Sequence, residues 1–534
     1  MKKHFSILTL VLAVAFSACS KSSKTGAEQG ADSDQVMYYT LLAEPEYLDP
    51  GLATDTSSSA VIAQLFEGLL DYDPKTLEPI AAVAKSWKIS SDAKTYTFSL
   101  RKNAKWSNGD PLTAHDFIYS WKRVLKPETA ARYAYQLYYI KNAQKINKGE
   151  IKDLSKLGVT AIDDYTLRVE LENPTPFFLS IAAFQTLRPV HQATVEKHDR
   201  RWTRAENMVN NGYFKLKTWE PNRHIILEKN PLYWDHEVVK LDRVHFLPIE
   251  DRETALKKVL SGEAHYVEDI PNVKIDSLKD HPEFVHGSYL GTYYLSLNNN
   301  KPPFDKLKFR QAINHAIDRD KLVQIINKGQ ANSSLTPKGI AGYEPPAGPE
   351  YDPAKAKKLL IEAGYADAAM VPPITILYNT SENHKMVLET VQSMLKTNLG
   401  ISVMIENMEW KVLLKRWKSK DFQASRAGWI GDYADPNTFS DLFTSDSGNN
   451  HTSWANDKYD MLIKLAARTT KQSKRFAILQ EAEALLLAEV PIVPLFTYSL
   501  PSLISNKLVG FHHNLQNKHP LKRVSIKEAA AAKK

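Results

Sequence analysis

The chain has 534 residues, of which 43% are hydrophobic and 24% are charged, with 28 prolines, 21 glycines and one cysteine. The apolar fraction excludes a disordered chain and the low glycine content excludes a fibrous one. The single cysteine excludes intramolecular disulfides and cysteine-based zinc clusters. The 69 lysine and arginine residues exceed the 61 aspartate and glutamate residues by +8, and they are spread out rather than gathered in a stripe typical of nucleic-acid binding.

The amino terminus has the parts of an export signal. Lys2 and Lys3 are basic, residues 5–16 (FSILTLVLAVAF) are apolar, and small residues follow up to Cys19. The apolar run suits a signal sequence but is shorter than the roughly 20 residues that span a membrane. Residues 1–18 are therefore predicted to be a signal peptide, and the mature protein is expected to be exported.

The position of the only cysteine indicates lipid attachment. Residues 16–19 (FSAC) resemble a bacterial lipobox, in which the cysteine is acylated, with phenylalanine where leucine is usual. The alternative is an ordinary signal peptide cleaved nearby, which leaves an incidental thiol. We predict a lipoprotein signal peptide, a lipid on Cys19, and a flexible tether at residues 19–35, because that stretch is small and polar. The anchor would hold the protein in the periplasm or at the outer face of the cell membrane.

The first regular elements follow the tether. Residues 95–100 (TYTFSL) alternate apolar and polar side chains, which predicts a half-buried strand. Thr113 and Asp116 have the spacing of a capping box and predict a helix that runs through Trp121.

Strand and helix patterns then alternate. The two-residue period returns at 167–171 and at 225–227. The proline-rich residues 337–353 predict a long surface loop, after which Asp352-Pro353 opens a helix that stops at Gly364. The chain is therefore expected to be mixed α/β without internal repeats.

The last elements lie close to the carboxyl terminus. Apolar residues at helical spacing predict a helix over 476–486. Residues 490–496 (VPIVPLF) predict a short buried strand, with its prolines at the strand ends or on an edge.

Motifs for covalent chemistry are missing. The chain has no phosphate-binding G-x-x-x-x-G-K, no G-x-S-x-G, no dinucleotide glycine pattern and no H-E-x-x-H. The pairs His512-His513 and His281/His286 lack carboxylates at ligand spacing, which favours exposed loop histidines over a metal site. A glycosidase-like carboxylate pair is compatible with the composition, but no local pattern indicates one. We expect no catalytic residues, no cofactor and no metal.

A series of blocks resembles the solute-binding proteins of peptide ABC transporters, most closely the oligopeptide-binding branch. The blocks stand in family order over nearly the whole mature chain. They are 46–50 (EYLDP), 65–70 (LFEGLL), 83–87 (VAKSW), 106–117 (WSNGDPLTAHDF), 211–216 (NGYFKL), 228–231 (EKNP) with 233–234 (YW), 291–294 (GTYY), 310–312 (RQA) with 316–319 (AIDR), and 426–433 (RAGWIGDY).

The resemblance implies an α/β fold of two lobes around a hinge, with an additional domain on the first lobe. The lobes would be built from discontinuous segments, with crossings near Tyr293 and Tyr498, and would close around a ligand. The implied segments are 36–66 for the first part of lobe I, 67–190 for the extra domain, 191–292 for the second part of lobe I, 293–498 for lobe III, and 499–534 for the return to lobe I.

The resemblance also implies where a peptide would bind. Gly428, Trp429 and Ile430 match the segment that pairs with the peptide backbone, and residues from Thr56 to Ser58 match the facing segment. Asp432 matches the acid that receives the peptide ammonium; its alternative role is to cap the turn before Asp435-Pro436.

The remaining implied positions lie at the carboxylate end and in the side-chain pockets. Arg426 and His384 match positions that meet peptide carboxylates; the alternatives are a surface ion pair and an exposed loop histidine. Trp410 and Trp429 match pocket walls, although an isolated tryptophan is more often simply core. Asn449 and Tyr498 match lining positions.

Three departures from the family bear on specificity. Trp417 stands where the oligopeptide-binding branch can carry an arginine, and Thr54, beside Asp55, replaces an acid. A lining tyrosine around Tyr135-Gln136 is shifted or lost.

The leading hypothesis is a monomeric, lipid-anchored receptor that captures short peptides and delivers them to ABC permease subunits at the inner membrane. A second keeps the fold but changes the ligand to a murein peptide, a metal chelate, haem or a sugar. A third is an exported hydrolase. An acid and a cation at opposite ends of one site would favour a zwitterionic peptide, because a sugar needs neither.

Overall fold

The computed structural model describes residues 35–527. The predicted signal peptide, Cys19 and all of the predicted tether except Gln35 lie outside the described residues. None of the helices between residues 35 and 527 has both the length and the apolar character needed to cross a bilayer.

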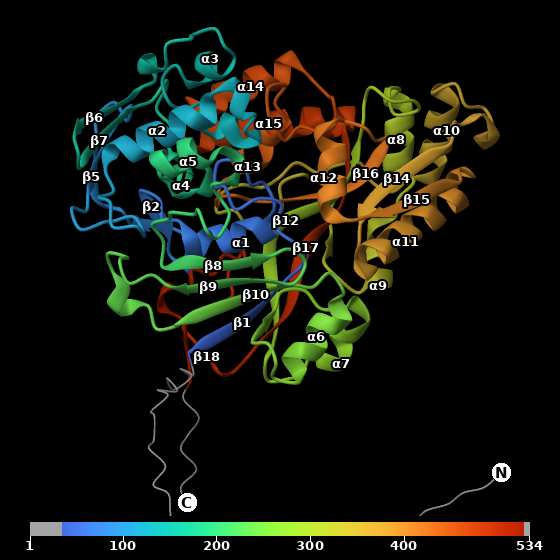
Figure 1. The fold of residues 1–534 in the computed structure, drawn as a ribbon. Coiled ribbons are helices and arrows are strands. Elements are labelled where there is room, and N and C mark those ends of the chain that lie inside the picture. Colours follow the sequence, from blue (N-terminus) through green and yellow to red (C-terminus); the bar gives the residue numbers. More distant parts are fainter. Residues whose placement is uncertain (1–34, 528–534) are drawn as a thin grey trace, which may run out of the picture. The chain divides into compact units, whose positions relative to one another are not determined.

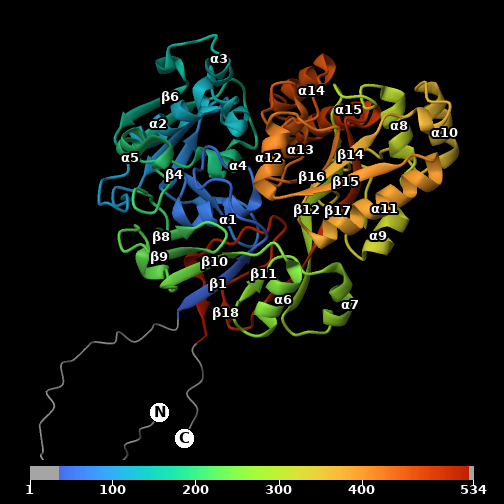
Figure 2. The same ribbon diagram turned by 45° about the vertical axis from the view of Figure 1, so that its right-hand side comes forward.

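An 11-stranded mixed sheet runs through the molecule in the order β15-β14-β16-β12-β17-β11-β1-β10-β9-β8, with β13 paired to β17 (Figure 1). Its strands are β1 (Val36–Leu41), β8 (Phe214–Glu220), β9 (His224–Lys229), β10 (Arg243–Pro248), β11 (Tyr266–Val267), β12 (Phe284–Leu297), β13 (Gln330–Ala331), β14 (Ile374–Asn379), β15 (Val403–Met408), β16 (Ala424–Ile430) and β17 (Ile492–Ile504). Strands from the two ends of this order form the two lobes, which Figure 2 shows on either side of β12 and β17.

β12 and β17 are long enough to belong to both lobes, and they pair in two stretches. Residues 284–288 pair with 499–503, and residues 292–296 pair with 492–497. The register shifts between Ser288 and Thr292, so the ladder is interrupted there. This break lies close to Tyr293 and Tyr498, where the resemblance places the crossings between lobes.

A separate four-stranded antiparallel sheet, β4-β5-β7-β6, forms the extra domain. The elements between β1 and β8 are α1 (Thr56–Leu65), β2 (Leu70–Tyr72), β3 (Pro79–Ala81), β4 (Ala84–Ile89), β5 (Thr95–Leu100), α2 (Ala114–Leu125), α3 (Ala143–Asn147), β6 (Val159–Asp163), β7 (Thr166–Glu170), α4 (Phe178–Ala183) and α5 (Gln192–His198). One buried core contains both Phe98 and Trp121 of this region and Phe246 of the large sheet. The extra domain therefore shares its core with the first lobe, as the expected fold of two lobes and an added domain requires.

Helices cover the strands of the other lobe, and a short hairpin lies near the carboxyl terminus. The helices after β10 are α6 (Arg252–Leu260), α7 (Ile275–Leu278), α8 (Leu307–His315), α9 (Arg319–Ile326), α10 (Pro353–Glu362), α11 (Glu382–Leu399), α12 (Trp410–Lys418), α13 (Asn437–Ser440), α14 (Asp457–Ala467) and α15 (Gln472–Glu489); the hairpin is β18 (Leu508–Val509) with β19 (Ser525–Ile526).

Local sequence patterns predicted several of these elements correctly. The strand expected at 95–100 is β5, and its alternate residues are buried. The capping box of Thr113 and Asp116 opens α2, where the Thr113 amide donates to Asp116 Oδ2 at 2.7 Å. β7, β9, α10 and α15 confirm the other predicted periods.

The prediction for residues 490–496 was wrong in extent and in the role of Pro494, whereas Pro491 directly precedes the strand as predicted. The strand β17 runs from Ile492 to Ile504 and lies inside the sheet. Pro494 faces Tyr294 where the register shifts, so a residue without an N–H is tolerated at an interruption of the ladder.

Candidate functional site

A cavity of about 310 Å³ lies between the lobes, which is within the usual range for ligand sites. Ten of the eleven predicted binding residues line it: Thr56, His384, Trp410, Arg426, Gly428, Trp429, Ile430, Asp432, Asn449 and Tyr498. Residues far apart in the sequence thus meet around one space.

Ser58 is the predicted binding residue that does not reach the cavity wall. It lies in the first turn of α1, where its amide donates to Asp55 Oδ1 at 2.8 Å and its hydroxyl to Asp55 Oδ2 at 2.6 Å. Residues 56–58 form the first turn of α1, so a contact of this facing segment with a ligand backbone would use helical amides and not a strand edge. Thr56 lines the cavity, and Asp55 beside it is the helix N-cap.

The second half of β16 has an unpaired edge. β14 pairs only with Ala424 and Ser425 of β16, whereas β12 pairs along the whole strand. The amide of Gly431 donates to Leu290 of β12 at 2.8 Å. Because the backbone groups of alternate residues point to opposite sides, Gly428 and Ile430 direct theirs away from β12. This edge can accept an added strand.

The side chain of Tyr498 leaves no room for a Cβ at position 428, which favours glycine there. A Cβ at position 428 would lie 2.2 Å from the Tyr498 hydroxyl oxygen and 3.1 Å from the nearest ring carbons. The sequence analysis explained this glycine by the close approach of a ligand backbone. The structure adds a second explanation, because the Tyr498 side chain occupies the space of a Cβ.

We expect Gly428→Ala to destabilise the protein by roughly 1–3 kcal/mol, the usual cost of overpacking. The double variant with Tyr498→Phe, which removes the nearest atom, should recover most of this loss. Urea unfolding of both variants and of Tyr498→Phe alone measures the effect. Equal stability of the single and double variants would contradict the assigned clash.

Asp432 stands just beyond the end of β16, on the cavity wall, and is only 7% exposed. Its Oδ1 accepts from the Tyr133 hydroxyl and its Oδ2 from Gln136 Nε2, both at 3.1 Å. Burial raises the pKa of the carboxyl to about 7, and the charge of Lys518 opposes that shift. The alternative role as a turn cap belongs instead to Asp435, whose Oδ1 accepts from the Asn437 amide at 2.9 Å.

Tyr133 was missed by the sequence analysis, which described a lining tyrosine around Tyr135-Gln136 as shifted or lost and gave Gln136 no role. Tyr133 and Gln136 lie in a 3-10 helix, η2 (Arg132–Leu137), of the extra domain. Its tyrosine-rich sequence was the available signal, but only the fold shows that Tyr133 is the tyrosine on Asp432. Binding of Asp432 by η2 also joins the extra domain to the other lobe.

The opposite end of the free edge holds Arg426. Its Nη2 donates to the Tyr498 hydroxyl at 3.4 Å, its guanidinium lies 5.3 Å from the centre of the Tyr293 ring, and its Nε has no partner among the described residues. His384 stands nearby in the first turn of α11, and burial, with a smaller effect of Arg426, holds its pKa well below the ordinary value. His384 therefore faces the cavity as a neutral group.

Cations on the cavity wall divide into paired and unpaired groups. Four of the six lining lysine and arginine side chains form ion pairs: Arg132 with Glu46, Arg188 with Asp71, and both Arg252 and Lys328 with Asp269. Within residues 35–527 Arg426 has no carboxylate partner, and Lys518 makes no direct ion pair, although the charge of Asp432 acts on it. Both residues are half-buried, and because a partly desolvated cation without an ion pair is costly, each can accept an anion from outside the chain.

Aromatic side chains form part of the remaining wall. Trp410 and Trp417 meet edge to face at 5.6 Å, and the Trp429 Nε1 donates to Thr438 O at 2.7 Å. Trp417 donates to the Ser425 hydroxyl at 2.8 Å and stacks on His451. The pocket wall at this position is thus neutral and apolar.

Among residues 35–527, no group of three or more histidine, cysteine, aspartate and glutamate side chains is placed to hold a metal ion.

Comparisons with known proteins agree with this geometry. The sequence profile described as bacterial extracellular solute-binding proteins, family 5 Middle, matches residues 78–451. The oligopeptide-binding protein OppA of Bacillus subtilis (strain 168) is 36% identical over 519 residues, which cover 93% of this chain and 95% of that protein. The structure of Haemophilus influenzae OppA in complex with RPPGFSPFR is 36% identical, with a TM-score of 0.87 over 93% of this chain and 99% of that chain.

Two structures of murein tripeptide-binding protein MppA indicate the state of the lobes. The Escherichia coli structure is 34% identical and covers 93% of this chain and 99% of its own, with a TM-score of 0.89. An unliganded open form is 35% identical over 92% and 98%, but its TM-score is 0.63. Since the identities are nearly equal, the lower score indicates that the lobes of this chain stand differently from those of that open form.

The family profile matches well over half of the chain, and OppA aligns with nearly all of it. The chain therefore belongs to the bacterial extracellular solute-binding proteins of family 5.

Proposed function

We propose that the protein captures short peptides in the cavity between its lobes and delivers them to the permease of an ABC transporter. The observation that carries this proposal is the free edge of β16, which runs from the unpaired cation Arg426 to the buried acid Asp432. A peptide in extended form offers a complementary backbone, an ammonium at one end and a carboxylate at the other.

The length of this edge favours short ligands. Asp432 lies six positions beyond Arg426, which is at most about 20 Å of extended chain. The long arginine side chain takes up part of that span. A peptide of roughly three to five residues would reach from one charge to the other.

The cellular setting is part of the same proposal. The amino-terminal pattern and the extracellular family support export, and acylation of Cys19 would keep a monomeric protein at the membrane beside its permease. The segments 36–66, 191–292 and 499–534 would form lobe I, 67–190 the extra domain and 293–498 lobe III. The break in the β12–β17 ladder supports the proposed crossings.

Binding and release require no covalent chemistry, so we propose no enzymatic activity. A murein peptide is the second candidate ligand, favoured by the similarity to MppA at a TM-score of 0.89. It would use the same two charges and the same strand edge, because it is also a peptide with a carboxylate.

Native mass spectrometry of the protein purified from its own cells tests the proposal. Closed binding proteins retain ligand, so we expect a heterogeneous set of short peptides, bound intact and identified after denaturation. Protein carrying both Asp432→Asn and Arg426→Met, purified in parallel, should come without them. An empty or glycan-filled wild-type cavity would contradict peptide capture, and cleaved peptides would indicate a hydrolase.

A further inference from the structure

Lys518 lies beside Asp432, at the end of the proposed site that would receive the ammonium of a peptide. It is therefore a cation at the end opposite to Arg426. Its Nζ donates to the main-chain oxygen of Asp432 at 2.6 Å and lies 4.0 Å from the centre of the Tyr72 ring. An ammonium has three donors, and this is the one hydrogen bond it makes within the described chain. The side chain lines the cavity, so the remaining donors are available to a ligand.

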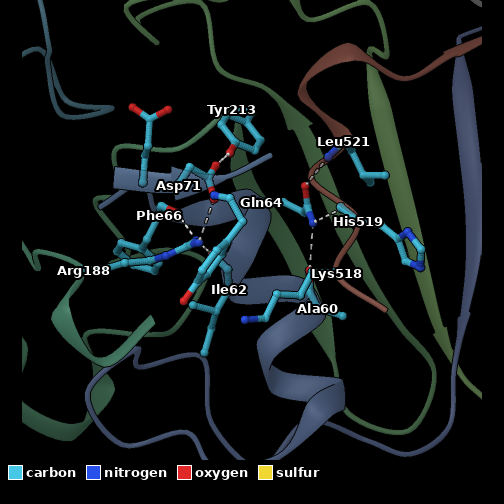
Figure 3. A network of polar contacts seen from close by, with 12 residues as sticks. Ala60, Ile62, Gln64, Phe66, Asp71, Arg188, Tyr213, Lys518, His519 and Leu521 are labelled. Carbon is cyan, nitrogen blue, oxygen red and sulfur yellow. Dashed lines mark hydrogen bonds and ion pairs between the residues drawn. The ribbon is translucent and has the colours of Figure 1, made fainter. Parts of the chain in front are cut away.

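The backbone around Lys518 is held on both sides. Asn514 Oδ1 accepts from the Lys518 amide at 3.1 Å, and Asn514 Nδ2 donates to the Lys518 carbonyl at 2.7 Å. Gln64 of α1 donates to His519 O at 3.0 Å and accepts from the Leu521 amide at 2.9 Å (Figure 3). Because its main chain is fixed in this way, the position of the ammonium belongs to the architecture of the site.

The charges that face Lys518 come from three other segments. Asp432 follows β16, Asp71 lies on β2, and Arg188 follows α4. Arg188 is already paired with Asp71 at 3.6 Å, and Figure 3 shows this pair with the Tyr213 hydroxyl on Asp71. Before a ligand arrives, this corner therefore holds two acids and two cations. The ammonium of a peptide would add a third cation without a new acid.

We propose that Lys518 is a specificity-determining residue, which makes this end of the site prefer peptides whose first residue carries an acidic side chain and disfavour those whose first side chain is basic. The inference rests on the proposed peptide binding and adds the substrate class. The first side chain leaves the ligand next to its ammonium, close to Asp432 and hence to Lys518. A carboxylate there would pair with the lysine, whereas a second ligand cation would be repelled.

Three tripeptides and two substitutions of one residue test this. The affinities of Glu-Ala-Ala, Gln-Ala-Ala and Lys-Ala-Ala are measured by titration calorimetry on the full chain. Wild type should bind the glutamate peptide about tenfold more tightly than the glutamine peptide, and the lysine peptide more weakly still. Lys518→Met should remove this order, and Lys518→Arg should keep it. Lys338→Met, which removes an exposed lysine, is the matched control.

A purely positioning role for Lys518 predicts a different result. If its contact with the Asp432 carbonyl only held the turn, Lys518→Met would weaken all three peptides equally, and an unchanged ratio would overturn the proposal. If none of the three peptides binds to wild type, the proposed function itself fails.

A pH series on wild type gives an answer even if Lys518→Met does not fold. Burial lowers the pKa of the Lys518 ammonium well below that of an exposed lysine, so the lysine loses its charge as the pH is raised through the neutral range. The glutamate side chain stays ionised over the series. Asp432, which faces Lys518, also titrates there, so the series is repeated on Lys518→Arg, whose cation keeps its charge and whose affinity ratio should change less. The ratio of the Glu-Ala-Ala to the Gln-Ala-Ala affinity should decline with rising pH, and a constant ratio would contradict the proposal.

Discussion

Replacing Asp432 by asparagine is expected to weaken the binding of a tripeptide with a free ammonium about tenfold or more, which corresponds to about 1.4 kcal/mol. The substitution keeps the size of the side chain and an oxygen that can accept from Tyr133, while the new amide nitrogen faces Gln136, whose own amide must turn to present its oxygen. It removes the negative charge, so a buried ligand ammonium would lose its partner. Titration calorimetry of Ala-Ala-Ala against both proteins measures the difference.

An amino-terminally acetylated peptide is the matched ligand, because it carries no ammonium. Wild type and the asparagine variant should bind it with similar affinity. If Asp432→Asn reduces the affinity for both peptides equally, the carboxylate shapes the site and does not receive the ammonium.

The same charge predicts a pH dependence for the free peptide. Burial raises the pKa of Asp432 to about 7, and an ammonium binds only the ionised form. Affinity should therefore fall as the pH decreases below about 7, by up to roughly tenfold per unit, and level off above it until the peptide ammonium itself titrates near pH 8. The affinity of the asparagine variant should not fall in this way as the pH decreases.

Replacing Arg426 by methionine is expected to weaken the binding of free tripeptides by a comparable factor, about tenfold or more. In the described structure the guanidinium makes two contacts. Its Nη2 donates a long hydrogen bond to the Tyr498 hydroxyl, and its centre lies near the ring of Tyr293. A ligand carboxylate would be its first anionic partner, and truncation of one member of a buried charge pair typically costs about 2–5 kcal/mol. Methionine keeps the length and the apolar stem.

A carboxyl-terminal amide separates this effect from lost packing. Wild type should prefer Ala-Ala-Ala to its amide, and Arg426→Met should bind both alike. Arg132→Met provides a matched control, since Arg132 lines the same cavity but pairs with Glu46 at 2.8 Å. A preference for the free acid that survives in Arg426→Met would assign the carboxylate to another cation.

Much of this arrangement could be predicted from the sequence, and the rest depends on long-range placement. The capping box at Thr113 and the alternation in β5 are local, and both were read correctly. The binding positions came from a resemblance rather than from a local pattern, and ten of them meet at one cavity. The position of Pro494 inside β17 was not predicted, because a proline is tolerated there only through the partner strand. The register of β12 shifts beside Tyr294, opposite this proline.

Charge pairing was the other information that the sequence did not contain. Six cations line the cavity, and which of them are neutralised depends on acids far away in the chain. Lys518 lies 86 residues from the carbonyl of Asp432 that it contacts. No motif marks such a lysine, and neighbouring sequence would suggest an ordinary solvated residue.

The interruption of the β12–β17 ladder can change the affinity for a ligand although its residues need not contact the ligand. If the lobes rotate about the break at residues 288–292, part of the interaction energy is spent on populating the closed arrangement. The measured dissociation constant is then the intrinsic one divided by the fraction of molecules that close. Substitutions at this break would change the affinities for all peptides by the same factor. The break would thus set how tightly the protein holds its ligands, and the cavity wall would set which ligands it holds. Affinity and specificity could then evolve separately.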